Sequence, residues 1–174
     1  NKLWNAARFA LMHVEKAPGN VSPESLPDRW ILSRLHRAAT AAADALDNYK
    51  FNEAASVLYQ FVWHEFCDWY LESVKPVLYG KKGEKAMEST RATLWLTLKN
   101  TLIVLHPFMP FVTEEIWSKL PGTQGSIMKA AFPVEKDERF QMRVDDKAEE
   151  DMALVMAAIT GIRNIRGEMN LSPS

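Results

Sequence analysis

Leu102-Ile-Val-Leu-His-Pro-Phe-Met-Pro-Phe-Val-Thr-Glu-Glu-Ile-Trp117 is the stretch from which the rest of the chain can be interpreted. Its two prolines have different consequences for a helix. Pro107 removes a backbone donor and disfavours helical backbone at His106, so one helix should end there. Pro110 is tolerated in the first turn of a new helix, where its missing N–H costs nothing. Both flanks are apolar, so the stretch predicts a buried junction that several other helices must cover.

The composition is that of an ordinary globular protein of 174 residues, with 47% apolar and 25% charged residues. The single cysteine excludes an intrachain disulfide and fits a reducing compartment, so we expect a cytoplasmic location. No apolar run reaches the roughly 18 residues of a membrane span, and no signal peptide is visible. We therefore expect no membrane partner. The chain starts at Asn1 and stops at Ser174 without a closing element, so we expect a fragment of a larger protein.

The net charge of −1 gives no overall attraction to nucleic acid, but the charges are unevenly distributed. Residues 1–43 carry six Lys or Arg and three acids, whereas residues 135–151 carry eight acids and four bases. Any RNA contact should therefore be a patch on the N-terminal helices rather than a property of the whole surface.

Apolar residues at helical spacing predict an all-α fold. The predicted helices cover about residues 2–14, 27–47, 51–75, 84–105, 110–120 and 147–169. The first should bury Leu3, Trp4, Ala7, Leu11 and Val14. Residues 126–133 should be extended, and residues 135–145 should form an exposed linker. We expect an antiparallel helical bundle in residues 1–133, and a linker with an extra C-terminal helix in residues 134–174, leading toward a missing C-terminal region.

Three stretches, in order along the chain, resemble one protein family. His106-Pro-Phe-Met-Pro-Phe-Val-Thr-Glu-Glu-Ile-Trp117 resembles the signature near the end of the anticodon-binding helical domain of class I aminoacyl-tRNA synthetases. Asn1-Lys-Leu-Trp-Asn-Ala-Ala-Arg-Phe9 resembles the start of that domain. Phe61-Val-Trp-His-Glu-Phe-Cys-Asp-Trp-Tyr-Leu-Glu72 is similar to the valine-specific member. The resemblance covers residues 1 to about 133, with moderate similarity again at Ile162-Arg-Asn-Ile-Arg-Gly-Glu-Met169.

This resemblance implies recognition of the anticodon of a valine-specific tRNA. The parent enzyme would join valine to that tRNA with ATP, and the rest of the parent chain would be a partner of this domain. The His-Ile-Gly-His and Lys-Met-Ser-Lys-Ser signatures of class I catalysis are absent, so we expect no catalytic residues and no cofactor here, and no DNA partner. Two alternatives stay open: the same domain from a leucine, isoleucine or methionine enzyme, or a helical protein–protein interaction module that binds no RNA.

Five residues near the N-terminus are candidates for contact with the anticodon. Arginine can hydrogen-bond base edges or phosphates, and an exposed tryptophan can stack on an unstacked loop base. The resemblance places base contacts on the first helix and at the start of the second. The candidates are Arg8, Arg29, Arg34, Trp30 and, through its amide, Asn5. A buried Trp30 together with scattered arginines would favour the interaction module or a pure scaffold.

Other polar groups have simpler structural interpretations. His64, Cys67 and Asp68 share one helical face, but one cysteine and no second ligand group make a metal site improbable. Glu114 and Glu115 point about 100° apart on a helix, so they cannot share an acid–base site. Arg163 and Arg166 are three residues apart and could touch an RNA stem or the missing downstream part, although a solvated helix face is the favoured interpretation.

Overall fold

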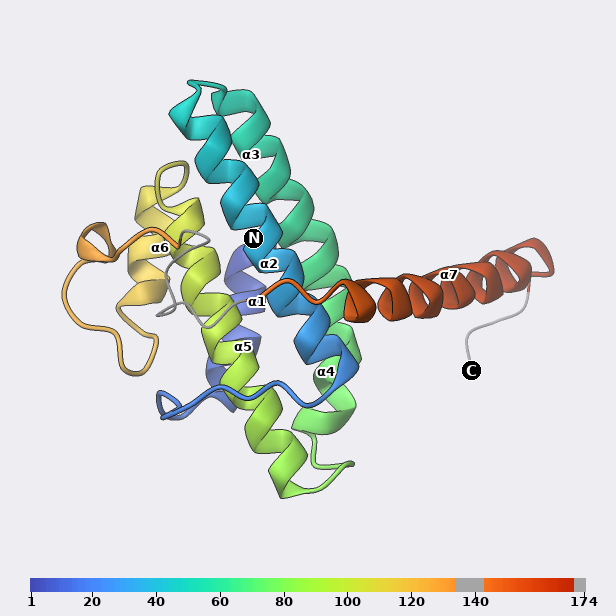
Figure 1. The fold of residues 1–174 in the computed structure, drawn as a ribbon. Coiled ribbons are helices and arrows are strands. Elements are labelled where there is room, and N and C mark those ends of the chain that lie inside the picture. The colour runs from blue at the N-terminus through green and yellow to red at the C-terminus, as the bar shows by residue number, and fades with distance from the viewer. Residues whose placement is uncertain (134–142, 171–174) are drawn as a thin grey trace.

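The structure is a computed structural model that describes residues 1–133 and 143–170. Its regular elements in these two ranges are all helices (Figure 1), which confirms the predicted all-α class. They are α1 (Lys2–His13), α2 (Leu26–Asp47), α3 (Phe51–Gln60), the π-helix η1 (Phe61–Tyr70), α4 (Leu71–Leu78), α5 (Glu84–Leu105), α6 (Pro110–Trp117), the 3₁₀ turn η2 (Ile127–Lys129) and α7 (Asp146–Glu168). Most of the predicted linker, at 134–142, and the chain end at 171–174 lie outside the described residues.

The junction between α5 and α6 forms where the two prolines predict it. α5 ends at Leu105, and Pro110 is the first residue of α6. Thr113 donates a hydrogen bond to the carbonyl of Met109 at 2.8 Å, and its hydroxyl lies 2.7 Å from Nδ1 of His106. These contacts close the turn, while Ile116 and Trp117 are buried in the core.

The predicted helix over 51–75 is a continuous run of α3, η1 and α4, whose middle ten residues are π-helical. A π-helix is rare at this length, because its i→i+5 hydrogen bonds widen the turn. Pro76 lies inside α4, so the helix continues two residues beyond the proline. Another correction concerns 126–133, predicted as extended, where η2 forms a short 3₁₀ turn.

Asp28 joins three helices in the core. Ser25 caps α2 by accepting a hydrogen bond from the Asp28 N–H. The fully buried Asp28 carboxylate accepts hydrogen bonds from Tyr70 of η1 and Thr90 of α5, both at 2.8 Å. Burial raises the pKa of Asp28, and the hydroxyl hydrogen bonds oppose part of that rise. The start of α2 is therefore fixed against both neighbours.

α7 projects from the bundle, with only its first turns against α2 (Figure 1). Ala148 and Met152 are its buried residues. Val155, Ile162, Ile165 and Met169 follow the predicted helical spacing, yet they are exposed. Arg163 lies over the ring of Trp69, 5.5 Å from its centroid. Neither α7 nor any other helix among the described residues is long and apolar enough to span a membrane.

Candidate nucleic-acid interface

The arginines of α2 are held by acidic side chains from two other helices. Arg29 pairs with Asp145 at 3.0 Å. Arg34 binds Glu65 of η1 with two nitrogens, at 2.8 and 3.1 Å, and Glu149 of α7 with a third at 3.0 Å. Arg37 pairs with Asp146 and with Glu149, the latter at 2.8 Å. We call this network, Arg29, Arg34 and Arg37 with Glu65, Asp145, Asp146 and Glu149, the arginine clamp.

Glu149 is the centre of the arginine clamp. Its partial burial raises its pKa, but hydrogen bonds from Ser33, Arg37 and Arg34 together bring the pKa below its ordinary value. Glu65 and Glu149 in turn raise the pKa of Arg34, with the hydrogen bond to Glu65 as the largest cause. The hydroxyl of Ser33 also accepts a hydrogen bond from the backbone N–H of Asp145 at 2.9 Å. The clamp thus fixes the N-terminus of α7 to α2.

The three candidates on α2, Arg29, Trp30 and Arg34, are less open to RNA than the sequence predicts. Trp30 is 2% exposed, so the prediction that it presents an exposed ring is wrong in this structure. Its position on the inner face of α2 places it among the core residues. Arg29 and Arg34 are engaged in the arginine clamp, and an RNA phosphate would have to displace their carboxylate partners. Their contact with RNA stays a prediction.

The other two candidates, Asn5 and Arg8, lie on the exposed face of α1. Trp4, predicted to be buried, is 37% exposed beside them, and Met12 continues the same face one turn after Arg8. The buried face of α1 consists of Leu3, Ala6, Ala7 and Ala10 instead. Within residues 1–133 and 143–170, Arg8 has no hydrogen bond or ion pair to another residue. We call Trp4, Asn5, Arg8 and Met12 the α1 face.

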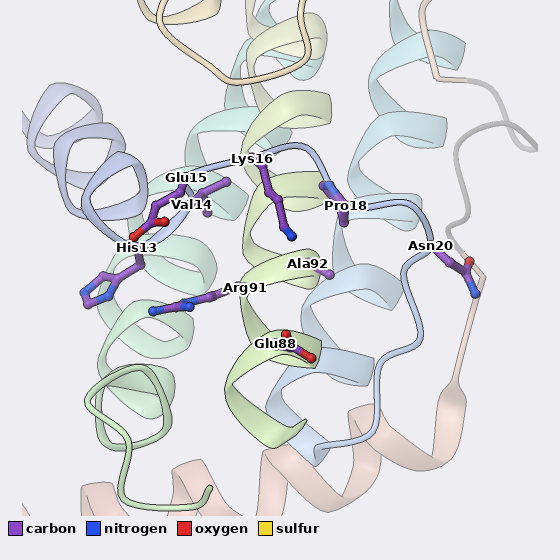
Figure 2. A pocket seen from close by; sticks show the side chains of 9 residues that line it. All are labelled: His13, Val14, Glu15, Lys16, Pro18, Asn20, Glu88, Arg91 and Ala92. Carbon is purple, nitrogen blue, oxygen red and sulfur yellow. The ribbon is translucent and has the colours of Figure 1, made fainter. Parts of the chain in front are cut away.

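A cavity of about 250 Å³ lies beyond the C-terminal end of α1, between the loop that follows it and α5 (Figure 2). Its ionisable lining comes from α1 and the loop (His13, Glu15, Lys16) and from α5 (Glu88, Arg91). Figure 2 shows the Lys16 side chain directed from the loop toward α5, and Arg91 directed toward His13. We call it the α1–α5 cavity. Sequence reasoning missed it, because its walls are 75 residues apart in the chain and no local motif connects them.

The remaining polar candidates have partners within the fold. Asp68 pairs with Lys2 at 2.6 Å and lies 3.5 Å from Nδ1 of His64, whereas Cys67 is buried. The described residues contain no group of three or more His, Cys, Asp or Glu placed to hold a metal ion. Glu114 accepts a hydrogen bond from Ser126 at 2.8 Å, and Glu115 pairs with Lys119 at 2.7 Å. The two adjacent glutamates therefore bind different neighbours.

Comparison with known proteins gives the family. The model of the anticodon-binding domain of tRNA ligase matches residues 28–174. The valine–tRNA ligase of Geobacter sulfurreducens is 53% identical over 182 residues, which cover 100% of this chain and 20% of that protein. The valine–tRNA ligase of Enterococcus faecalis is 44% identical over 174 residues, covering 98% of this chain and 19% of that protein. The chain thus spans about a fifth of the length of the curated relatives it matches.

A solved structure has the same fold. A LeuRS of Agrobacterium radiobacter K84, in a ternary complex with tRNA and LeuAMS, matches 83% of this chain and 16% of its own chain. The TM-score is 0.53 at 21% sequence identity, so this likeness supports the fold alone. Together with the family match over most of its length, it shows that this chain belongs to the anticodon-binding domains of tRNA ligases, and it is similar over its full length to valine–tRNA ligases.

Proposed function

We propose that this chain recognises the anticodon of a valine-specific tRNA as a domain of a valine–tRNA ligase, and that it does so with the α1 face. The observation that carries the proposal is that Trp4, Asn5 and Arg8 are exposed together on one helix, with Arg8 free of any carboxylate among the described residues. The whole enzyme would join valine to the tRNA with ATP in a part of the protein outside this chain.

The three side chains have complementary chemistry for an unstacked loop base. The indole of Trp4 offers an apolar plane on which any base can stack. The Asn5 amide can donate to and accept from a base edge, and Arg8 can bind a base edge or a phosphate. Sequence-specific RNA recognition commonly targets loops whose bases can be splayed onto such groups, and an anticodon is a loop of this kind.

The arginine clamp has a different part in this proposal. Arg34 and Arg37 orient α7 and leave RNA contact to α1. The bundle of residues 1–133 would then be the recognition unit, and α7 would lead from it toward the rest of the parent chain. In this proposal the three arginines of α2 pair with carboxylates and hold the fold together, while α1 contacts the RNA.

Binding to a hairpin tests the proposal. The RNA carries a valine anticodon in its loop, and a second hairpin has altered second and third anticodon bases. We expect fluorescence anisotropy to show tighter binding of the valine loop at low salt, and weaker binding as salt rises. Arg8→Ala and Trp4→Ala should each weaken binding about tenfold, while Trp4→Phe should keep most of it because a ring remains.

The outcome that contradicts the proposal is equally specific. If both hairpins bind equally well, or if Trp4→Ala and Arg8→Ala leave the preference for the valine loop intact, the α1 face does not read the anticodon. If the chain binds neither hairpin at low salt, the anticodon function is rejected for this chain.

A further inference from the structure

We propose that the α1–α5 cavity receives a single unstacked nucleobase of the RNA whose loop lies on the α1 face. This inference rests on the proposed function, and it adds a second recognition site that binds a base by its edge, beside the exposed face where a base can stack.

The first argument is that two residues lining the cavity each carry an unsatisfied buried polar atom. Nε of Arg91 and Nε2 of His13 are both buried and have no hydrogen-bond partner within the described ranges. A buried donor without a partner destabilises the folded protein, and most such groups in native structures are paired. Both atoms belong to residues that line the cavity, so a shift of either side chain would let a bound group complete these hydrogen bonds.

The second argument is that the charges around the cavity are present but unpaired. Lys16 and Arg91 carry positive charge, and Glu15 and Glu88 carry negative charge. In the part of the chain that the structure describes, none of these four forms a hydrogen bond or ion pair, although opposite charges line the same cavity. Every arginine of the clamp, by contrast, is bound to a carboxylate. The cavity thus keeps donors and acceptors available for a ligand.

The third argument selects the ligand. Burial lowers the pKa of His13, and the positive charge of Arg91 lowers it further, so the imidazole is neutral near pH 7. Two positive and two negative side chains then leave the cavity without net charge. A phosphate would meet both carboxylates at close range, which opposes its binding. A nucleobase is neutral and carries donors and acceptors side by side on its edge, which matches this lining.

The size and walls of the cavity fit a flat ring. A volume of about 250 Å³ is many times the space that a single water molecule needs, so the cavity has room for a ring the size of a base. Val14, Pro18 and Ala92 add apolar surface to the lining. Glu88 and Arg91 are three residues apart on α5 and so share one helix face. Glu88 supplies a hydrogen-bond acceptor and Arg91 supplies a donor beside it. A base edge that carries both an amino or imino hydrogen and a ring acceptor requires this arrangement.

The cavity is also continuous in sequence with the α1 face. Arg8 and Met12 are spaced by one turn, and Lys16 follows four residues later, just beyond the end of α1 at His13. A strand of RNA that contacts Arg8 could therefore continue along α1 and deliver its next unstacked base to the cavity.

The test compares two cavity variants with a matched control, using the valine-anticodon hairpin. Arg91→Met removes the unsatisfied donor and keeps an apolar side chain of similar length, and Glu88→Gln removes one carboxylate while keeping its shape. Lys50→Met is the control: it also removes one positive charge, but at the turn between α2 and α3, where Lys50 pairs only with Glu53 among described residues. We expect at least tenfold weaker binding for Arg91→Met, about threefold for Glu88→Gln and less than twofold for Lys50→Met.

The outcomes separate this inference from the proposed function. Circular dichroism melting of each variant shows whether it is folded, and Arg91→Met should melt no lower than the wild type. If Arg8→Ala weakens binding while folded Arg91→Met and Glu88→Gln bind as the wild type does, the cavity inference is overturned and the proposed function stands. If Arg91→Met and Lys50→Met weaken binding equally, the cavity contributes charge alone and holds no base, which also overturns it. If the wild type binds no hairpin, both are rejected.

Discussion

The arginine clamp and the α1–α5 cavity use the same residue types for opposite purposes. In the clamp, Arg34 binds two carboxylates from different helices, at 2.8 and 3.0 Å. In the cavity, Arg91 has no carboxylate partner within the described residues, and its Nε is buried without a hydrogen bond. An arginine whose donors are satisfied within the protein holds the fold together. An arginine whose donors are left open destabilises the protein slightly and is available to a ligand.

The comparison changes where an RNA contact should be sought. The N-terminal 43 residues are rich in basic side chains, and α2 supplies three of the six. Those three point to the acidic N-terminus of α7, which carries Asp145, Asp146 and Glu149. The excess of positive charge in one segment and of negative charge in another therefore reflects their contact with each other, whereas Arg8 of α1 has no carboxylate partner among the described residues.

The largest loss of stability should come from substitution of Asp28, a buried carboxylate that accepts its hydrogen bonds from hydroxyl groups. It is a fully paired site with which the clamp and the cavity can be compared. Asp28→Ala removes the acceptor of Tyr70 and Thr90, which are both buried. We expect a loss of about 3 kcal/mol in the free energy of unfolding, measured by urea denaturation. Tyr70→Phe, which removes a single hydrogen bond, should cost about 1 kcal/mol. If Asp28→Ala cost less than about 1 kcal/mol, this buried site would not be a principal connection between the helices.

Removal of Arg34 should break the clamp. Arg34→Ala leaves Glu65 and Glu149 without this partner, and because the site is partly buried we expect a loss of about 2 kcal/mol, between the values for exposed and buried ion pairs. Hydrogen exchange of α7 should accelerate, and affinity for the hairpin should change less than twofold. Arg34→Lys should be intermediate, because lysine cannot bind both carboxylates with a planar fork. Tenfold weaker RNA binding with α7 still protected would assign Arg34 to the RNA.

Acid should release α7 through Glu149. The folded-state pKa of Glu149 lies below the ordinary value of 4.5, so as pH falls the unfolded chain binds the proton first. Its stabilisation is complete above that value and is lost as pH falls through the folded-state pKa. Asp28 has a raised pKa and changes stability in the opposite direction, so exchange protection of α7 is the proper measurement. Glu149→Gln should abolish the pH dependence in α7; if α7 still loses protection over the same range, another group controls its release.

The smallest change in stability should come from Arg91→Met at the cavity, which we expect to leave stability unchanged or to raise it. Arg91→Met removes a buried donor that has no partner, so the free energy of unfolding should stay within about 1 kcal/mol of the wild type, unchanged or higher. Urea denaturation measures this directly beside Arg34→Ala. A loss as large as that of Arg34→Ala would mean that Arg91 is structural, and the contrast between the two regions would fail.

The sequence predicted those parts of the fold that depend on local chemistry. The two prolines predicted the end of α5 and the start of α6. The π-helical segment was not predicted, because its apolar residues have a spacing that an α-helix also explains. In α7 the helix was predicted, but the burial of its apolar face was not observed. Val155 and Ile162 have helical spacing and are exposed, because spacing alone does not tell which face another element covers.

The candidate site was predicted in part, and the errors have a common cause. Both Trp4 and Trp30 stand beside apolar positions, so periodicity cannot decide which indole faces inward. The alanines of α1 make its buried face without any large residue, which leaves Trp4 outside. The pairs between α2 and the start of α7 join residues more than 100 positions apart, as Arg34 and Glu149 do, and no local pattern reveals them. Asn5 and Arg8 lie on the exposed face of the first helix, where the family resemblance placed base contacts, and their contact with RNA stays a prediction.

One measurement tests the central claim that RNA contact belongs to α1 and the cavity rather than to the arginines of α2. Side-chain ¹⁵N–¹H spectra would follow the Nε–H groups of the arginines during titration with the valine-anticodon hairpin. We expect the signals of Arg8 and Arg91 to shift, with Arg91 identified by its loss in Arg91→Met, and those of Arg29, Arg34 and Arg37 to stay in place. Shifts confined to the α2 arginines, with Arg8 and Arg91 unchanged, would contradict the account.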